Sequence, residues 1–418
     1  MLSLDVRKVL QREISEFGVK AQRLTDHRQE AKESFQALNL DGEIKAYTEL
    51  EYRSMPILDL AARKRDFSVY GIDSGSTRLM PFENGTTLCA NQAVMCAEPP
   101  ISVNKLTSPQ VDKLPLEAFR TVSIVSHSHR NELGGARTQR HELGLVHLWR
   151  IHISKDFLKR KIDQIVKGFS DCASEGWHTL RMLKELDLKD GLVILDGSIY
   201  PIGLYYYLVS EERFDWDINL VEWEESLDVL AQPVKIAESF RQRQIPYVGI
   251  NKNPETRYLI NFCMTEEKRN WTNDRQFIGA VLGDVSKDEL SYTNWFMQEA
   301  YPSRLVKAEG SFDLFKELRV FKLKLEPEAY HVCFFFVYDP RVRSVLKIET
   351  PRAVLDFCDP NELRLWVLSE IARGKGVPNV LRKADSRARI TQEERLALLQ
   401  CSPVRVDISY NQTRGEPI

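Results

Sequence analysis

Residues 67–78 read Phe67-Ser-Val-Tyr-Gly-Ile-Asp73-Ser-Gly-Ser-Thr-Arg78, an apolar segment that runs directly into an acidic turn. Its first half is rich in β-branched and aromatic side chains, which predicts a buried strand over 68–72. A carboxylate at the end of such a strand is unfavourable unless a cation or a hydrogen-bond donor meets it. The glycine that follows lets the backbone or a ligand approach closely. This pattern predicts either a binding site or a simple turn at the carboxyl end of the strand.

The same arrangement occurs again at Gly191-Leu-Val-Ile-Leu-Asp196-Gly-Ser198, where four apolar residues lead to an aspartate. Aspartate and glycine are ordinary turn residues, so each motif alone is also explained as a turn after a strand. Its repetition after a second apolar strand favours a site. Two strand-end aspartates that converge would suit a divalent metal ion, since hard cations prefer carboxylate oxygens.

The bulk composition excludes several classes of protein. The 418 residues suffice for two or three average domains or one large decorated domain. A hydrophobic fraction of 43% and a net charge of −2 indicate an ordinary globular protein without global basicity. Seven scattered cysteines without a Cys-x-x-Cys pair favour reduced thiols and a cytoplasmic location. The sequence has no signal-peptide pattern and no run of about 18 apolar residues, so we expect no membrane span.

The order of the predicted elements is that of an α/β protein with an RNase H-like mixed sheet flanked by helices. Strands at 86–95 and 121–125 extend the sheet begun at residue 68, and a helical stretch follows that includes the apolar segment 144–149. A long amphipathic helix is predicted over 157–186, directly before the strand that ends at Asp196.

The second half of the chain adds further strands. Residues 245–250 predict a buried strand, and 318–325, 331–338 and 342–349 predict three consecutive strands. Segment 270–310 has a mixed pattern that we could not assign.

The N-terminal 62 residues predict a helical arm, because several apolar residues recur at helical spacing between charged ones. They are Val6, Val9, Leu10, Ile14 and Phe17. Such an arm serves either as a partner or dimer surface or as simple packing on the core. We therefore divide the chain into an arm over 1–62, an RNase H-like domain with insertions over 63–400 and a tail over 401–418.

Glu175 is the candidate for a third acid. It lies on the predicted helix, 21 positions before Asp196, so a short loop can return the chain to the sheet edge beside both aspartates. Glu142 and Glu185 are rivals. The alternative for each is a solvated glutamate, which is the commoner environment of this residue.

Basic residues accompany these acids. Lys252 follows the strand over 245–250, where it would meet a phosphate or an acidic cluster unless it is a plain surface lysine. A helix from about Asn379 would place Leu381, Ala384, Ala388 and Leu396 inward, with Asp385 beside that face as a fourth acid.

Four basic residues surround Asp385 on this helix: Arg382, Lys383, Arg387 and Arg389. They predict either a surface that contacts phosphates or a solvated helix face with internal ion pairs. Elsewhere, His127 and His129 lack a third ligand at metal spacing, and we expect them to be loop residues.

Five segments resemble, in order, the signatures of the NurA nuclease family. They are Tyr70-Gly-Ile-Asp73-Ser-Gly-Ser, Val193-Ile-Leu-Asp196-Gly-Ser198, Pro246-Tyr-Val-Gly-Ile-Asn-Lys252, Val342-Arg-Ser-Val-Leu-Lys-Ile-Glu-Thr-Pro351 and Gly376-Val-Pro-Asn-Val-Leu-Arg-Lys-Ala-Asp385. The ordered set covers about residues 66–395, most of the chain. The first motif reads Asp-Ser-Gly-Ser where Asp-Gly-Ser is usual, and residues 95–175 do not align with the family pattern.

This resemblance implies an RNase H-like fold and a manganese-dependent DNA nuclease that forms a homodimer. It also implies a hexameric HerA-type translocase as partner, in DNA end resection or in a related defence system. Asp73 and Asp196 match the strand-end metal acids, Glu175 matches the helix glutamate by position, and Asp385 stands where the family has a late metal-binding His or Asp. Hydrolysis would use two Mn²⁺ or Mg²⁺ ions.

Two other classes of function remain open on the residues alone. The turn at Asp73 also resembles the phosphate-binding turn of sugar kinases and actin-like ATPases, although the sequence has no late Gly-Gly adenosine loop. A non-catalytic DNA- or ATPase-binding protein would keep the acids only as turns. Stabilisation by nucleotide would favour an ATPase, whereas stabilisation by Mn²⁺ alone would favour a nuclease.

Overall fold

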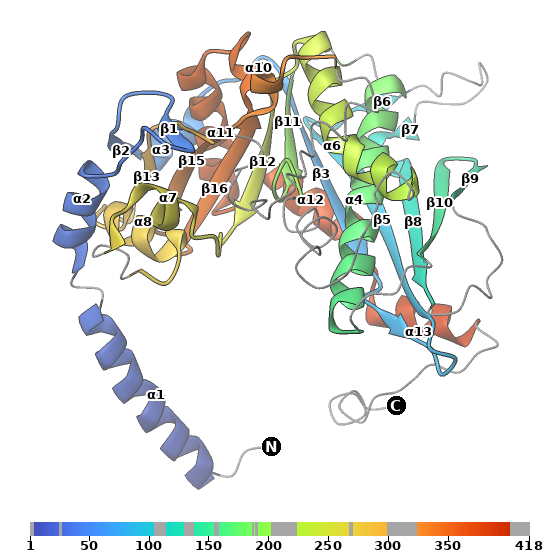
Figure 1. Ribbon diagram of the computed structural model, residues 1–418, viewed down its shortest axis with the longest axis horizontal. Coiled ribbons are helices and arrows are strands. Elements are labelled where there is room, and N and C mark those ends of the chain that lie inside the picture. Colours follow the sequence, from blue (N-terminus) through green and yellow to red (C-terminus); the bar gives the residue numbers. More distant parts are fainter. Residues whose placement is uncertain are drawn as a thin grey trace, which may run out of the picture.

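The computed structural model describes most of the chain. The described ranges are 4–24, 27–103, 114–128, 138–153, 159–185, 188, 191–201, 224–266, 271–298 and 324–401. Within them the chain forms one large mixed sheet with helices on both faces (Figure 1). The predicted α/β class is confirmed.

The main sheet has 14 strands in the described ranges. From one edge to the other they are β1 (Ile44–Ala46), β14 (Phe296–Gln298), β15 (Val332–Asp339), β16 (Ser344–Pro351), β12 (Tyr247–Lys252), β11 (Gly191–Asp196), β3 (Ser68–Ser76), β5 (Thr87–Glu98), β8 (Arg120–His127), β10 (Val146–Ile153) and β9 (Thr138–Leu143). Off this path, β13 (Glu289–Thr293) pairs with β15 and β2 (Tyr52–Pro56), and β4 (Met80–Pro81) pairs with β5. A separate ribbon joins β6 (Ser102–Val103) and β7 (Leu114–Pro115).

The helices are distributed along the whole chain. They are α1 (Leu4–Leu24), α2 (Arg28–Gln36), α3 (Ile57–Ala62), α4 (Lys159–Glu185), α6 (Glu224–Arg243), α7 (Tyr258–Cys263), α8 (Asp274–Leu282), α10 (Arg352–Leu355), α11 (Pro360–Gly374), α12 (Asn379–Ala388) and α13 (Gln392–Gln400). No described helix is both long enough and apolar enough to cross a membrane.

Two helices cover the centre of the sheet from opposite sides. Helix α4 packs on β5, β8 and β3, with α6 beside it, whereas α12 packs on β3 and β5 from behind (Figure 1). Strand alternation explains this division, because successive side chains point to opposite faces. The side chain of Ser74 on β3 contacts α4, whereas Gly71 and Gly75 of the same strand lie against α12.

The glycines of β3 allow α12 to lie directly on the strand. A Cβ atom at Gly71 would lie 2.8 Å from the carbonyl carbon of Val380, and one at Gly75 would overlap the carbonyl oxygen of Ala388. Glycine is the residue that permits such a close approach of two backbones. The small residues of the first motif therefore bring α12, and Asp385 with it, against the end of β3.

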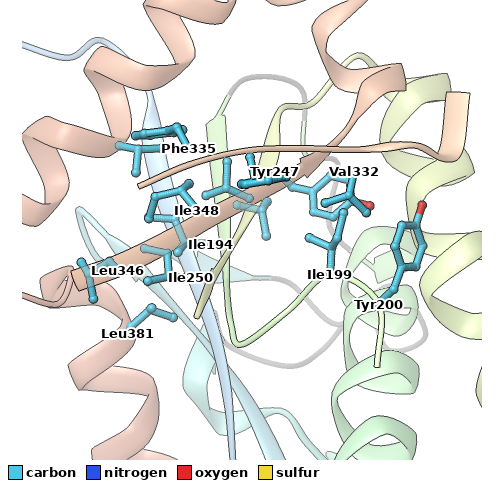
Figure 2. Packing of buried hydrophobic residues seen from close by; sticks show 14 of the residues in the cluster. Ile194, Ile199, Tyr200, Tyr247, Ile250, Val332, Phe335, Leu346, Ile348 and Leu381 are labelled. Carbon is cyan, nitrogen blue, oxygen red and sulfur yellow. The ribbon is translucent and has the colours of Figure 1, made fainter. Parts of the chain in front are cut away.

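The core continues across β11, β12 and β16. Ile194, Ile250, Leu346 and Ile348 project from these neighbouring strands, and Leu381 of α12 lies beside them (Figure 2). All five side chains are buried. Burial of apolar area at this density stabilises the sheet by about 25 cal/mol per Å² removed from water. The strands that carry the acids thus pack on a buried apolar core.

The N-terminal region differs in part from the predicted helical arm. Helix α1 projects from the body (Figure 1). However, β1 pairs with β14 and β2 pairs with β13, so part of the first 62 residues belongs to the sheet. Both strands are short, and such segments give little periodic signal.

Two other predictions on secondary structure are corrected, the unassigned segment now has elements, and one predicted strand is mostly untested. Residues 144–149 were expected within a helical stretch. Instead, residues 144–145 form the turn between β9 and β10, and residues 146–149 begin β10. Leu396 was expected to face inward, but it is exposed on α13. Segment 270–310 contains α8, β13 and β14. Most of the predicted strand over 318–325 lies outside the described residues.

Candidate functional site

The two strand-end aspartates lie side by side. Strands β3 and β11 are parallel neighbours in which Leu195 pairs with Ile72, so the next residues, Asp196 and Asp73, stand at the same level. Parallel partners in register point to the same face of a sheet. Asp73 is 6% exposed, and Asp196 is half-buried. The chain thus brings together the two acids on which the sequence analysis was centred.

The environment of Asp73 favours its neutral form. Burial and the nearby carboxylate of Asp196 raise the pKa of Asp73 to about 8, with a smaller contribution from Asp385. The Ser74 backbone N–H, which donates to Asp73 Oδ1 at 2.7 Å, opposes this rise in pKa, as does Lys252. Neighbouring carboxylates raise each other's pKa in this way because their negative charges repel.

Lys252 already binds one of these acids. Its Nζ atom lies 2.6 Å from Asp196 Oδ2, across the parallel pairing of β12 with β11. The lysine thus pairs with an acid of the candidate site, although its own side chain is 36% exposed. Whether it also contacts DNA stays a prediction.

Glu175 approaches the same strand end from the α4 side. Its Oε1 atom accepts a hydrogen bond from the Ser74 hydroxyl. Burial raises the pKa of Glu175 well above its usual value; the Ser74 hydroxyl lowers it, and Asp171, Asp73 and Asp196 raise it further. Glu175 thus shares the electrostatic field of both aspartates. Ser74, which binds Glu175, faces α4, whereas Asp73 lies between Gly71 and Gly75, which face α12, so the role of Glu175 as a metal ligand stays a prediction.

The rival glutamates lie elsewhere. Glu142 is exposed on the edge strand β9 and pairs with Arg140 at 2.7 Å. Glu185 is the last residue of α4 and pairs with Arg181 at 2.9 Å. Each carboxylate already has a cationic partner outside the strand ends, so the geometry favours Glu175.

Helix α12, which carries Asp385 and most of the basic residues, runs along β3 from Gly71 to Gly75. Asp385 is exposed and close enough to raise the pKa of Asp73. The four basic side chains Arg382, Lys383, Arg387 and Arg389 are also exposed. In the described part of the chain none of them forms an ion pair with a carboxylate, which argues against a helix face held by internal pairs.

Two further residues were missed in the sequence. Ser74 donates from its backbone to Asp73 and from its hydroxyl to Glu175, and so bridges the two acids. Asp171 lies one helical turn before Glu175; burial raises its pKa to about 6, and the Asn91 amide donates to it. The i, i+4 spacing of Asp171 and Glu175 was a signal that could have revealed it.

The donor set fits a divalent cation. Among the described residues, no three His, Cys, Asp or Glu side chains are close enough together to hold a metal ion as they stand. Asp73, Asp196 and Asp385 nevertheless supply hard carboxylate oxygens; burial raises the pKa of Asp73, and Lys252 pairs with Asp196. Oxygen ligands of this kind select Mg²⁺ or Mn²⁺ over zinc.

None of the histidines in the described ranges contacts the acids of this site in the hydrogen bonds and ion pairs above. His127 ends β8 and is buried, so it is not the loop residue that we expected, and His129 lies outside the described residues.

Comparison with known proteins identifies the family. The family model of the NurA domain matches residues 67–390, most of the chain. The chain belongs to the NurA family. The match begins at the first residue of the strand–turn motif and ends just beyond α12, so it contains every acid described above.

Solved NurA structures resemble this protein at low sequence identity. The NurA nuclease from Sulfolobus solfataricus has 10% identity and a TM-score of 0.49, with 94% of this chain and 95% of that chain covered. A NurA bound to dAMP and manganese has 10% identity and a TM-score of 0.43, with 96% and 98% covered. No match was found among curated proteins.

Proposed function

We propose that this NurA-family protein is a metal-dependent DNA nuclease that hydrolyses phosphodiester bonds with Mn²⁺ or Mg²⁺. The observation that supports this most directly is the placement of Asp73 and Asp196 at the same level on two neighbouring parallel strands. One of the solved NurA structures contains manganese and dAMP, which agrees with a metal and a nucleotide as ligands. We include the RNase H-like class of the sheet in this proposal.

We assign each acid a role from its position. Asp73 and Asp196 would hold the metal together, with Asp385 from α12 and Glu175 from α4 completing the ligand set. When bound, two such ions lower the pKa of a water molecule and stabilise the leaving oxygen. The positive side chains would hold the DNA: Lys252 beside the acids, and the basic face of α12 along the phosphate backbone.

Lys252 would exchange partners when substrate and metal arrive. Its ammonium now pairs with Asp196 at 2.6 Å. If Asp196 held a metal ion, Lys252 would leave that carboxylate and donate to a phosphate oxygen of the DNA.

The assembly and the pathway belong to the same proposal. We propose a homodimer that works with a hexameric HerA-type translocase, in the cytoplasm, in DNA end resection or in a related defence system. The exposed apolar side of α1 supports a surface for a partner or a second copy. Family membership favours the nuclease over the ATPase and the non-catalytic binding protein.

The test is cleavage of end-labelled linear DNA, single- and double-stranded, in Mn²⁺, Mg²⁺ or EDTA. Asp73→Asn and Asp196→Asn should each abolish the metal-dependent cutting seen with the parent. Cutting that survives both substitutions would place the activity elsewhere on the chain. No cutting by the parent, even with a HerA-type partner and ATP, would overturn the nuclease and leave the ATPase or binding protein.

A further inference from the structure

Strand β16 carries a buried ion pair that the proposed reaction does not use. Lys347 Nζ lies 2.8 Å from Glu349 Oε1, and the two side chains are only 4% and 7% exposed. The ammonium also lies 4.3 Å from the centroid of the Phe334 ring. Because two buried charges lose their hydration, such a pair is often no more stable than apolar residues of the same size. Stability alone therefore does not account for it.

The other oxygen of Glu349 reaches a different strand. Glu349 Oε2 accepts a hydrogen bond of 3.2 Å from the backbone N–H of Ile199. Ile199 closes the turn that follows Asp196, and β12 lies between this turn's strand and β16. The carboxylate thus spans two strand spacings and fixes the chain just after an acid of the candidate site.

Further contacts of this turn in the described residues come from β12. Gly197 adopts a positive φ of 103°, and its N–H donates to Ile250 O at 2.9 Å. The Asn251 amide donates to the Ser198 hydroxyl at 3.3 Å. A Cβ atom at Gly249 would lie 2.5 Å from Gly197 O, so the turn rests directly on the β12 backbone. Glu349 holds the last residue of the turn.

The side chains of Glu349 and Asp196 lie on opposite faces of the sheet. Lys252, the partner of Asp196, stands opposite Leu346 on β16. Because Leu346 and Glu349 are three positions apart on one strand, their side chains point to opposite faces. Glu349 can therefore influence Asp196 only through the backbone of the turn.

We propose that Glu349, anchored by Lys347, is a positioning residue that fixes the turn after β11 and thereby aims the Asp196 carboxylate at the metal. This inference rests on the proposed function, since it assigns Asp196 to the metal. Groups behind a metal ligand commonly change metal affinity by about tenfold to a hundredfold when they are removed. We expect a change in metal affinity near tenfold, because Glu349 contacts the backbone of the turn and not Asp196 itself.

Two double variants separate positioning from simple stability. Lys347→Met with Glu349→Leu replaces the ion pair with apolar side chains and removes the acceptor for the Ile199 N–H. Lys347→Met with Glu349→Gln also removes both charges but keeps an amide oxygen as that acceptor. Asp339→Asn is the control, because Asp339 forms a buried ion pair with Arg341 on the same hairpin, away from the turn.

Mn²⁺ binding, followed by electron paramagnetic resonance of the free ion, is the measurement, with cleavage as a second readout. We expect the Met/Leu variant to raise the Kd for Mn²⁺ by about tenfold. The Met/Gln variant and Asp339→Asn should stay within about twofold of the parent. Equal affinity in all three variants, or losses that follow their thermal stability, would overturn the inference.

The two proposals fail in different ways. If the parent binds no Mn²⁺ in a manner that depends on Asp196, as Asp196→Asn would show, the proposed function itself is wrong, and the inference with it. If the parent binds Mn²⁺ through Asp196 while the Met/Leu variant binds it equally well, only the role of Glu349 is wrong.

Discussion

Asp73 is the residue at which burial and function oppose each other most clearly. The folded protein holds this carboxyl protonated up to a pKa of about 8, whereas the unfolded chain releases the proton near the ordinary value of 3.8. Between these two values the unfolded state binds fewer protons, so stability falls as pH rises. The slope approaches 1.4 kcal/mol per pH unit for one group.

Asp73→Asn should therefore stabilise the metal-free protein at pH 8 by a few kcal/mol while abolishing cleavage. This stabilisation relative to the parent should shrink towards pH 5, where the buried Asp73 costs the parent less stability. Denaturant unfolding in EDTA at pH 5 and 8 measures it. The exposed Asp66, replaced by Asn, is the control. The same pH dependence in the parent and in Asp73→Asn would contradict the expectation.

At the residue scale, replacing Ser74 should also change the pKa of Glu175. Its hydroxyl is the group that lowers the pKa of Glu175 against the effect of burial. Ser74→Ala should raise that pKa further, so the ionised carboxylate appears only at higher pH. We expect Mn²⁺ binding to weaken by about tenfold at neutral pH, and the loss to become smaller as the pH rises.

A titration of Mn²⁺ affinity against pH measures this shift, with Ser76→Ala as the matched control two positions along β3. An unchanged pH profile in Ser74→Ala would mean that Glu175 does not take part in metal binding. The family pattern has Asp-Gly where this chain has Asp-Ser, so the hydroxyl is a feature of this sequence that spacing alone could not interpret.

At the scale of elements, the sequence predicts what periodicity and composition encode. The apolar strands β3, β11 and β12 and the amphipathic helices α4 and α12 were placed correctly, because each has a clear period or a continuous apolar run. Contacts between distant segments were not predictable in this way. Glu349 and Ile199 are 150 positions apart, and only the strand order joins them.

Helix α12 is the element that should set DNA affinity. Lys383→Gln together with Arg387→Gln removes two exposed cations and should weaken binding without a large change in kcat at saturating DNA. The slope of log K against log salt should fall by about 0.9 per lost phosphate contact on duplex DNA, or about 0.7 on a single strand. Binding isotherms at several salt concentrations measure it.

The matched control removes the neighbouring exposed pair Arg63 and Lys64, next to α3, which is a different element. It should leave the slope unchanged. An identical slope in the α12 variant and the parent would restore the alternative of a solvated basic face that DNA does not touch.

At the scale of the whole molecule, helix α1 carries exposed apolar residues on one side. This helix projects from the body, and its apolar residues are exposed, with Leu10 at 43% and Ile14 at 68% (Figure 1). Such residues on one side of a helix normally pack against another surface. We predict that this side of α1 is buried against a second copy in solution, in agreement with the proposed homodimer.

Leu10→Glu with Ile14→Glu should therefore shift the protein towards the monomer, because two carboxylates would be buried without partners. Light scattering coupled to gel filtration measures the mass. Lys8→Glu with Ser15→Glu places two carboxylates on the opposite side of α1 and should leave the mass unchanged, since neither position shares the face of the i, i+4 pair Leu10 and Ile14. Thermal stability of the body should change little in either variant, because α1 contributes no residue to the described core. A dimer that persists with Leu10 and Ile14 replaced would place the dimer interface elsewhere on the molecule and leave the apolar side of α1 for a different partner, such as the translocase.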